Sequence, residues 1–265
     1  MPPLNSSLKG APSSAATELA KVISEIAPDI LGAQEVDYFL QRSAGQNQIA
    51  EIARGAGANY WAFAPALIGD PDGHWRKLTP ADPAVITSTS PLAEPGYGIG
   101  IISKIPVISW HRLELKGAPF GLPMPFPNSQ TGDGKTQWLY IKDHPRCALA
   151  AVLESGWLII NTHLSFLPFY SYLQLLKVKR WSRTLPISDK SKIIILGDLN
   201  SPLAFLARGV GWNSLIKQKT FPSWSAKFQM DYILSQKISG EDISPQPAIF
   251  SGLSDHLPIT IKIPF

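Results

Sequence analysis

The sequence of 265 residues contains one cysteine, Cys147, and so cannot form an internal disulfide bond. This excludes a disulfide-stabilised secreted domain and is compatible with a reducing compartment. The chain also lacks a strong excess of charge of one sign. It has 24 Lys and Arg residues and 20 Asp and Glu residues, which give a formal net charge of +4. A small basic excess suits an anionic substrate, but many proteins without one share it.

Long uninterrupted apolar runs are absent as well. The longest apolar stretch, residues 157–176, is broken by Asn161, His163 and Pro168, a pattern that a lipid-spanning helix tolerates poorly. Residues 1–16 lack the apolar core of a signal peptide. We therefore expect a cytoplasmic protein without a membrane span.

Apolar residues make up 45 % of the chain, enough for a substantial core. A helical pattern at residues 17–28 precedes a strand-like run at 29–37, and the same order recurs as a helix at 170–185 and a strand at 192–200. No composition break marks a domain boundary. The pattern predicts an α/β fold in a single domain over residues 1–265.

Two stretches between these halves, residues 96–115 and 146–165, are rich in β-branched and aromatic residues and predict hairpins. Residues 117–136 are rich in Gly and Pro and predict a long surface loop, and a second loop is expected at 65–83. The C-terminal third returns to strand-like segments.

Polar side chains interrupt or end the apolar strands at five places. These places are Glu35, His163, Asp198 with Asn200, Asp231, and Asp255 with His256. Carboxylate, amide and imidazole groups without thiolates suit a hard cation such as Mg²⁺ or Mn²⁺. Neither HExxH nor CxxC occurs, which argues against zinc.

Each of these residues also has a structural explanation. A glutamate at a strand end is usually solvated, a single histidine is usually hydrogen-bonded, and Asp198 with Asn200 fits an Asx turn. Asp231 fits a β-bulge or an edge strand. Because that explanation requires five independent coincidences, we predict instead that the residues share one site.

Six segments resemble the endonuclease/exonuclease/phosphatase superfamily in their order and approximate spacing. They are QEVD (34–37), YGIGIISKIPV (97–107), NTHLS (161–165), GDLNS (197–201), MDYIL (230–234) and SDHLPI (254–259). GDLN together with SDHLP is the specific part of the pattern. The resemblance implies a four-layer α/β sandwich, with two mixed sheets face to face and helices outside.

The resemblance also implies a metal-dependent phosphoester hydrolase. In this interpretation Glu35 is the main Mg²⁺ ligand, and Asp255 helps to hold the metal. Asp198 and Asn200 correspond to the pair that positions the attacking water and the phosphate. A divalent ion offsets the negative charge that protects a phosphodiester from nucleophiles.

Two histidines complete the implied site. His256 corresponds to the general base, or to an imidazolium that stabilises the pentacovalent phosphorus, and Asp231 would orient its ring. His163 would donate to a non-bridging phosphate oxygen. Ile99, two residues after Tyr97, replaces a polar residue that often supports this first histidine, so the partner of His163 stays open.

Further substrate-binding residues are less strongly indicated. Asn5 corresponds to an asparagine that ends the first strand, but Met1 lies four residues before it, so we expect a shortened strand. Arg42 is assigned to phosphate binding, although a solvated loop arginine is the simpler reading. Tyr97 and Gln174 are weaker assignments of the same kind.

The shared catalytic residues do not identify the substrate, because loops decide specificity in such folds. The segments 74–77 and 177–181 are basic and aromatic, as nucleic-acid surfaces are, whereas 166–170 is apolar and suits a phospholipid headgroup or a small diester. We predict a phosphodiesterase. The alternatives are a nuclease acting on DNA and a catalytically silent binding scaffold of the same fold; no protein partner is inferred.

Overall fold

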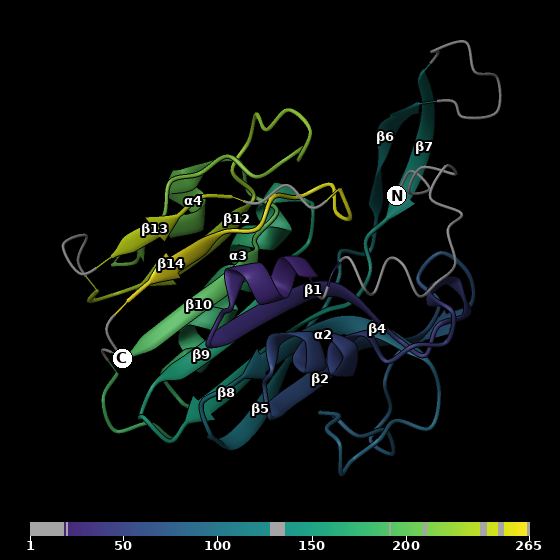
Figure 1. The fold of residues 1–265 in the computed structure, drawn as a ribbon. Helices are drawn as coiled ribbons and strands as arrows, with labels where there is room; N and C mark the ends of the chain where they lie inside the picture. Colours follow the sequence, from purple (N-terminus) through teal and green to yellow (C-terminus); the bar gives the residue numbers. More distant parts are fainter. Residues whose placement is uncertain are drawn as a thin grey trace.

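The computed structural model describes residues 19, 21–127, 136–190, 192–208, 211–238, 243–248 and 252–263. Two β-sheets pack face to face, with helices on their outer sides (Figure 1). This arrangement confirms the predicted four-layer α/β sandwich. Asn5, expected to end a first strand, lies outside the described residues. That residues 1–265 form one domain stays a prediction.

The described strands of the first sheet, in the order β1-β4-β2-β3, are all antiparallel, so this sheet is not mixed as predicted. Its strands are β1 (Ile30–Tyr38), β2 (Tyr60–Gly69), β3 (Trp75–Arg76) and β4 (Gly96–Ser103). Helix α2 (Gln48–Ala56) covers the outer face and buries Ile49 there. The Asn47 side chain accepts from the amide of Ala50 to begin this helix, and Gly57 ends it in the left-handed conformation.

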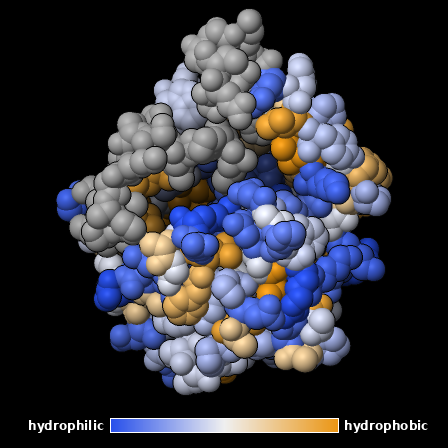
Figure 2. All heavy atoms as spheres, turned by 90° about the vertical axis from the view of Figure 1, so that its right-hand side faces the viewer, coloured by the Kyte–Doolittle hydropathy of each residue, from blue (hydrophilic) through white to orange (hydrophobic). Residues whose placement is uncertain are grey.

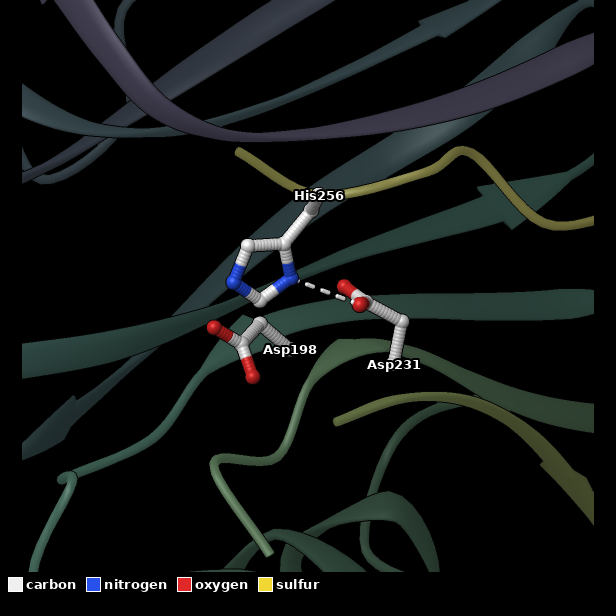
Figure 3. A group of neighbouring side chains, drawn as sticks. All are labelled: Asp198, Asp231 and His256. Carbon is white, nitrogen blue, oxygen red and sulfur yellow. Dashed lines mark hydrogen bonds and ion pairs between the residues drawn. The ribbon is translucent and has the colours of Figure 1, made fainter. Parts of the chain in front are cut away.

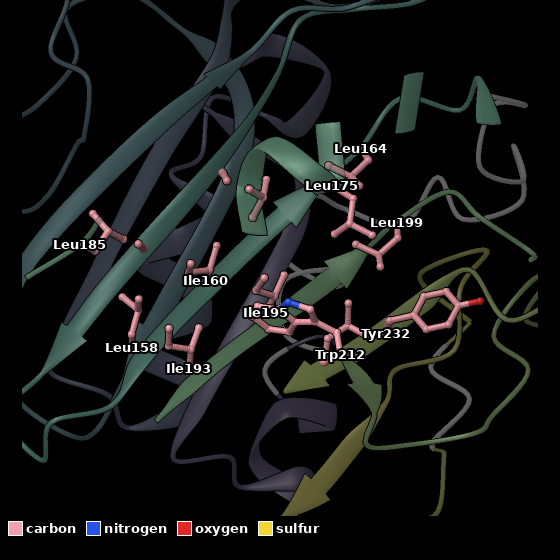
Figure 4. Packing of buried hydrophobic residues seen from close by; sticks show 14 of the residues in the cluster. Leu158, Ile160, Leu164, Leu175, Leu185, Ile193, Ile195, Leu199, Trp212 and Tyr232 are labelled. Carbon is pink, nitrogen blue, oxygen red and sulfur yellow. The ribbon is translucent and has the colours of Figure 1, made fainter. Parts of the chain in front are cut away.

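The second sheet is mixed, in the order β11-β12-β10-β9-β8-β5. Its strands are β5 (Val107–Leu115), β8 (Arg146–Leu153), β9 (Leu158–His163), β10 (Ile193–Asp198), β11 (Asn213–Ser214) and β12 (Asp231–Ser235). Only β9 and β10 are parallel, and the crossover between them carries helix α3 (Pro168–Ser182). Helices α3 and α4 (Ala204–Arg208) pack on the outer face. Figure 4 shows Leu175 of α3 beside Leu164 and Leu199 in this cluster.

Strand β10 is apolar without alternation because both of its faces are covered. Ile193 and Ile195 pack in the cluster under α3, whereas Ile194 packs between the two sheets. Ile99 of β4 is buried in the same interface between the sheets. Its apolar side chain therefore belongs to the core.

The hairpin predicted for residues 96–115 is wrong. Strand β4 pairs with β1 and β2, whereas β5 pairs with β8 in the other sheet. The chain turns between them at Ser103, whose hydroxyl donates to the carbonyl of Ile105 at 2.7 Å. Local sequence predicts that these residues are extended, but long-range packing decides which sheet each strand joins. The hairpin predicted for 146–165 is confirmed as β8 and β9.

The long loop predicted for residues 117–136 is also wrong. Strands β6 (Gly121–Pro127) and β7 (Thr136–Lys142) form an antiparallel pair, which we call the ribbon, and it projects from the body of the molecule (Figure 1). Prolines at 123, 125 and 127 occupy every second position of β6. Their missing N–H groups therefore face one edge, and the other edge keeps its donors for β7.

The remaining predictions hold with shifted boundaries. The expected helices and strands at 17–28, 29–37, 170–185 and 192–200 correspond to helical residues 21–26, β1, α3 and β10. The loop predicted at 65–83 is only partly present, because β2 extends to Gly69 and β3, at Trp75–Arg76, pairs with it. Near the C-terminus, β13 (Ser244–Gln246) pairs with β14 (Thr260–Lys262). No helix in the described ranges has the length and apolarity needed to cross a bilayer.

Candidate active site

Three of the predicted site residues lie side by side at one edge of the second sheet. Asp198 at the end of β10 is opposite His163 at the end of β9 and opposite Asp231 at the start of β12. Paired residues point to the same face of a sheet, with Cβ atoms about 5 Å apart. Asp198 shares its face with Ile194, which packs against the first sheet. The three polar side chains are therefore directed toward the first sheet.

His256 reaches this cluster from the loop before β14. Its Nδ1 lies 2.7 Å from Asp231 Oδ2, and Asp198 lies next to the pair (Figure 3). One ligand atom from each of Asp198, Asp231 and His256 lies within 4.8 Å of the others. The loop is held by the Ser223 amide, which donates to the carbonyl of Asp255 at 2.7 Å. The contact expected between His256 and Asp231 is present.

Asp198 and Asn200 form a tight turn after β10. The Asn200 amide donates to Asp198 Oδ1 at 2.7 Å, and Asn200 Nδ2 donates to the carbonyl of Leu164 at 2.9 Å. Asn200 has φ +48°, a left-handed conformation that asparagine tolerates better than most residues. The Asx turn considered from sequence is thus real. It also holds Asp198 at the sheet edge.

Glu35 approaches from the first sheet through a β-bulge. The register of β1 against β4 shifts between Ala33 and Val36, which inserts one extra residue, and Glu35 has φ +56°. A bulge redirects the side chains of a strand, and a left-handed conformation in a non-glycine residue costs about 1–3 kcal/mol. Glu35 interacts electrostatically with Asp255 and His256. The bulge therefore brings Glu35 to the cluster.

Asn161 of β9 ties this bulge to the second sheet. Its Nδ2 donates to the carbonyls of Ala33 at 2.9 Å and Gly100 at 2.8 Å, and its Oδ1 accepts from Gln34 Nε2 at 2.6 Å. The side chain is completely buried. In the sequence Asn161 was only an interruption of an apolar run; its position two residues before His163 was the available signal.

Arg146, at the start of β8, is the main residue that the sequence analysis missed. Its Nη1 lies 3.2 Å from Nδ1 and 3.1 Å from Nε2 of His163. Because one nitrogen is nearly equidistant from both ring nitrogens, the guanidinium lies over the imidazole face. Its Nε lies 3.9 Å from the buried Asp143. A charged residue directly before the apolar run 147–153 was the signal that would have found it.

The surroundings explain the charge states of the two histidines. Burial, together with the charges of Arg146 and His256, holds the pKa of His163 well below its ordinary value. Burial lowers the pKa of His256, but hydrogen bonding to Asp231 and nearby carboxylate charges outweigh it and raise that pKa to about 9. At neutral pH His163 is therefore neutral and His256 is protonated.

The carboxylates near the site, Glu35, Asp198, Asp231 and Asp255, outnumber its cationic groups, Arg146 and the protonated His256. Burial raises the pKa of Asp198, and the charge of Asp231 raises it further. Burial also raises the pKa of Glu35, which Arg146 partly offsets. Desolvated carboxylates that repel one another are stabilised by a cation, and their oxygen donors fit a hard divalent ion. Asp198 and Asp231 lie close enough together to share such an ion. Glu35 and Asp255, which the sequence predicted to hold it, interact electrostatically with His256 in the same cluster.

Arg42 and Tyr97 support this site from the first sheet. Arg42 pairs with both carboxylate oxygens of Asp37, at 3.0 and 2.7 Å, and with Asp72 at 2.6 Å. The guanidinium lies 5.4 Å from the centre of the Tyr97 ring, and the Tyr97 side chain hydrogen-bonds Glu35. Phosphate binding by Arg42 would therefore require it to leave these carboxylates.

Gln174 has a structural position away from the cluster. Its Oε1 accepts from the amide of Ser165 at 2.7 Å, and its Nε2 donates to the carbonyl of Lys116 at 2.9 Å. Through these two bonds, Gln174 connects the segment that follows β9 to the segment that follows β5. Gln174 thus shapes the surroundings of the site and is not part of it.

A model of the Endonuclease/Exonuclease/phosphatase family matches residues 5–256. No curated protein sequence matches the chain. Among solved structures, sphingomyelinase C from Streptomyces griseocarneus has a TM-score of 0.58 at 13 % identity, covering 94 % of this chain and 91 % of that one. TDP2 from D. rerio, complexed with a single-strand DNA product, has a TM-score of 0.53 at 13 % identity, covering 96 % and 93 %.

An endonuclease/exonuclease/phosphatase from Beutenbergia cavernae DSM 12333 has a TM-score of 0.52 at 14 % identity. The match covers 94 % of this chain but only 66 % of that longer protein. Identities this low show a shared fold. The family model, in contrast, spans both the Glu35 bulge and the His256 loop, so the chain belongs to the endonuclease/exonuclease/phosphatase family.

Proposed function

We propose that the chain is a divalent-metal-dependent phosphodiesterase. The observation that carries this proposal is the His256–Asp231 pair, joined at 2.7 Å beside the buried Asp198. Glu35 interacts with this group from the facing sheet. Hydrogen-bonded imidazole, buried carboxylates and a neighbouring guanidinium match what phosphoryl chemistry needs: charge stabilisation and proton transfer.

Glu35 and Asp255 are proposed to hold Mg²⁺ or Mn²⁺, with Asp198 and Asp231 close enough to contribute. When bound, such an ion supplies Lewis acidity and neutralises charge on a phosphate oxygen. The burial of Asp198 supports this assignment, because a buried carboxylate is costly to keep ionised without a cation nearby. The pKa of Glu35 is raised as well, so an ion beside it would stabilise its charged form.

His256 acts in this proposal as an imidazolium. Its raised pKa, about 9, keeps the ring protonated at neutral pH, so it donates to a phosphoryl or leaving-group oxygen. Asp231 accepts from Nδ1 and leaves Nε2 for the substrate. Of the two roles considered from sequence, charge stabilisation is thus favoured over general base.

Asp198 is proposed to accept the proton of the attacking water. Burial raises its pKa toward neutrality, which improves a carboxylate as a proton acceptor. Asn200 fixes Asp198 through its backbone amide. Arg146 and the neutral His163 lie on the other side of Asp198 and are proposed to bind the non-bridging phosphate oxygens.

Turnover of bis-p-nitrophenyl phosphate, measured with EDTA, Mg²⁺ or Mn²⁺, tests the proposal. We expect metal-dependent turnover that falls by about 10²–10⁴-fold in His256→Gln and Asp198→Asn. His74→Gln is the matched control, because His74 is exposed. Metal-independent turnover, or full activity in His256→Gln, would overturn the assignment.

A substrate panel then distinguishes the alternatives. It contains sphingomyelin, plasmid DNA, an abasic oligonucleotide, an inositol phosphate and p-nitrophenyl phosphate as a monoester. Preference for DNA would identify a nuclease, and preference for the monoester would contradict a phosphodiesterase. No turnover of any member by a folded, metal-loaded protein would support the silent scaffold.

A further inference from the structure

The ribbon exposes aromatic residues on a strand pair that belongs to neither main sheet. Trp138 is 68 % exposed and Tyr140 is 59 % exposed. Soluble proteins rarely gather large exposed apolar side chains without using them for binding. Figure 2 faces this side of the molecule and shows hydrophobic residues at the surface among hydrophilic ones.

Both faces of the ribbon are apolar. Trp138 and Tyr140 are two positions apart and share one face, whereas Leu139 lies on the other face opposite Met124. Leu139 is itself exposed. A ribbon packed on a protein core would bury one of its faces, and this one leaves large side chains accessible on both.

Helix α3 continues the apolar surface. Phe169, Leu173 and Leu176 are exposed at a spacing of four and three residues, which places them on one side of the helix. The Tyr170 ring contacts Phe120, at the root of the ribbon, with 5.7 Å between ring centres. The ribbon and the first turns of α3 therefore form one neighbourhood, which we call the ribbon–helix surface.

The charge around this surface is mainly basic, and the exposed Glu114, next to Lys177, is an acidic neighbour. The segments 116–127, 136–142 and 168–183 contain no Asp or Glu. The exposed basic side chains of these segments are Lys116, Lys142, Lys177, Arg180 and Arg183. At the root, Asp143 is buried and hydrogen-bonded, and Asp72 interacts with His144.

We propose that the ribbon–helix surface binds an anionic lipid bilayer. The surface combines exposed Trp, Tyr and Leu side chains with Lys and Arg at its margin. Side chains of these kinds partition into the boundary between lipid headgroups and acyl chains. Basic residues next to it attract anionic lipids. A single-stranded nucleic acid would use the aromatic rings and the charges, but it leaves the exposed aliphatic Leu139, Leu173 and Leu176 without a partner.

The surface adjoins the candidate site. Strand β5 ends at Leu115, which pairs with Arg146 at the start of β8. The ribbon lies between these two residues in the chain, so it begins and ends at this edge of the sheet. Asp143, between the ribbon and Arg146, accepts from the amide of Ala118 and from the hydroxyl of Ser165. These bonds anchor the ribbon at the same sheet edge as His163. A bound bilayer would therefore lie beside the candidate site.

Sedimentation with vesicles tests the proposal without relying on turnover. The full chain is mixed with vesicles of equimolar phosphatidylglycerol and phosphatidylcholine, or of phosphatidylcholine alone. We expect binding to the anionic vesicles, reduced by added salt. In Trp138→Ala/Tyr140→Ala the partition coefficient onto these vesicles should fall about a hundredfold, since each aromatic ring withdrawn from water contributes about tenfold.

The control is Tyr60→Ala/Ile108→Ala. Both residues are exposed and lie at the far ends of the sheets, near Ser103 and Leu153. This variant should bind as the wild type does, and Trp138→Phe should keep most of the binding. Turnover of bis-p-nitrophenyl phosphate should be unchanged in all three variants, so a failure of lipid binding stays separate from a failure of the proposed hydrolase.

Three outcomes would overturn the proposal. The first is wild-type protein that remains in solution with both kinds of vesicle. The second is undiminished binding by a folded Trp138→Ala/Tyr140→Ala protein. The third is binding to a single-stranded oligonucleotide but not to vesicles, lost in the same variant, which would assign the surface to nucleic acid.

Discussion

Asn161 Nδ2 lies 2.9 Å from the carbonyl oxygen of Ala33, across the interface between the two sheets. This bond and its partner to Gly100 join a strand of one sheet to two strands of the other. Ala33 opens the bulge that carries Glu35. One buried amide therefore couples the packing of the sandwich to the placement of a proposed metal ligand.

Replacing Asn161 tests this coupling. In Asn161→Leu the two carbonyls and Gln34 lose their partner, and each unsatisfied buried group costs about 1–3 kcal/mol. We expect the free energy of unfolding, measured in urea, to fall by about 3 kcal/mol or more. Asn213→Leu, at an exposed position of β11, should change it little. Equal stability of wild type and Asn161→Leu would show that the bond is dispensable.

Glu35→Gln tests metal binding without measuring activity. A metal that binds only the folded state at a hundred times its dissociation constant stabilises it by about 2.7 kcal/mol. We expect Mg²⁺ or Mn²⁺ to raise the melting temperature of the wild type and to have little effect on Glu35→Gln. Glu51→Gln, on the surface of α2, should keep the full response. A full response in Glu35→Gln would remove Glu35 from the metal site.

His256 makes stability depend on pH in the absence of metal. Its folded-state pKa, about 9, lies above the ordinary value of 6.5, so its stabilisation is complete below pH 6.5 and is lost as the pH rises through 9. The loss amounts to at most about 3 kcal/mol. The free energy of unfolding, measured in urea and EDTA from pH 6.5 to above pH 9, should fall in the wild type more than in His256→Gln. Parallel profiles would contradict the raised pKa, and His74→Gln should follow the wild type.

Arg146→Lys tests the residue that lies against His163. Lysine keeps the charge but loses the planar fork that can bind two phosphate oxygens. We expect kcat for bis-p-nitrophenyl phosphate to fall by about 10²-fold, the usual cost of one charge-stabilising donor. Arg54→Lys, exposed on α2, is the control. If kcat is unchanged while stability falls, Arg146 serves only to pack His163.

Sequence patterns predicted helices and strands well where local composition and burial alone determine the conformation. Residues 170–185 contain no Gly or Pro, and Pro168 stands in the first turn, which together favour α3. The run 193–196 specifies a strand covered on both faces. The same reasoning was wrong for 96–115 and 117–136. In the first case neighbouring strands joined different sheets, and in the second alternating prolines permitted a strand that composition alone disfavours.

The sequence by itself determined which chemical groups are available: acidic, amide and imidazole side chains at the ends of apolar runs, with no thiolate among them. Only the tertiary structure decided their neighbours. Strand register sets Asp198 beside His163 and Asp231, and the bulge turns Glu35 toward them. Arg146 and Asn161 gained their positions the same way, because contacts between residues far apart in the chain depend on pairing and packing that no local pattern encodes.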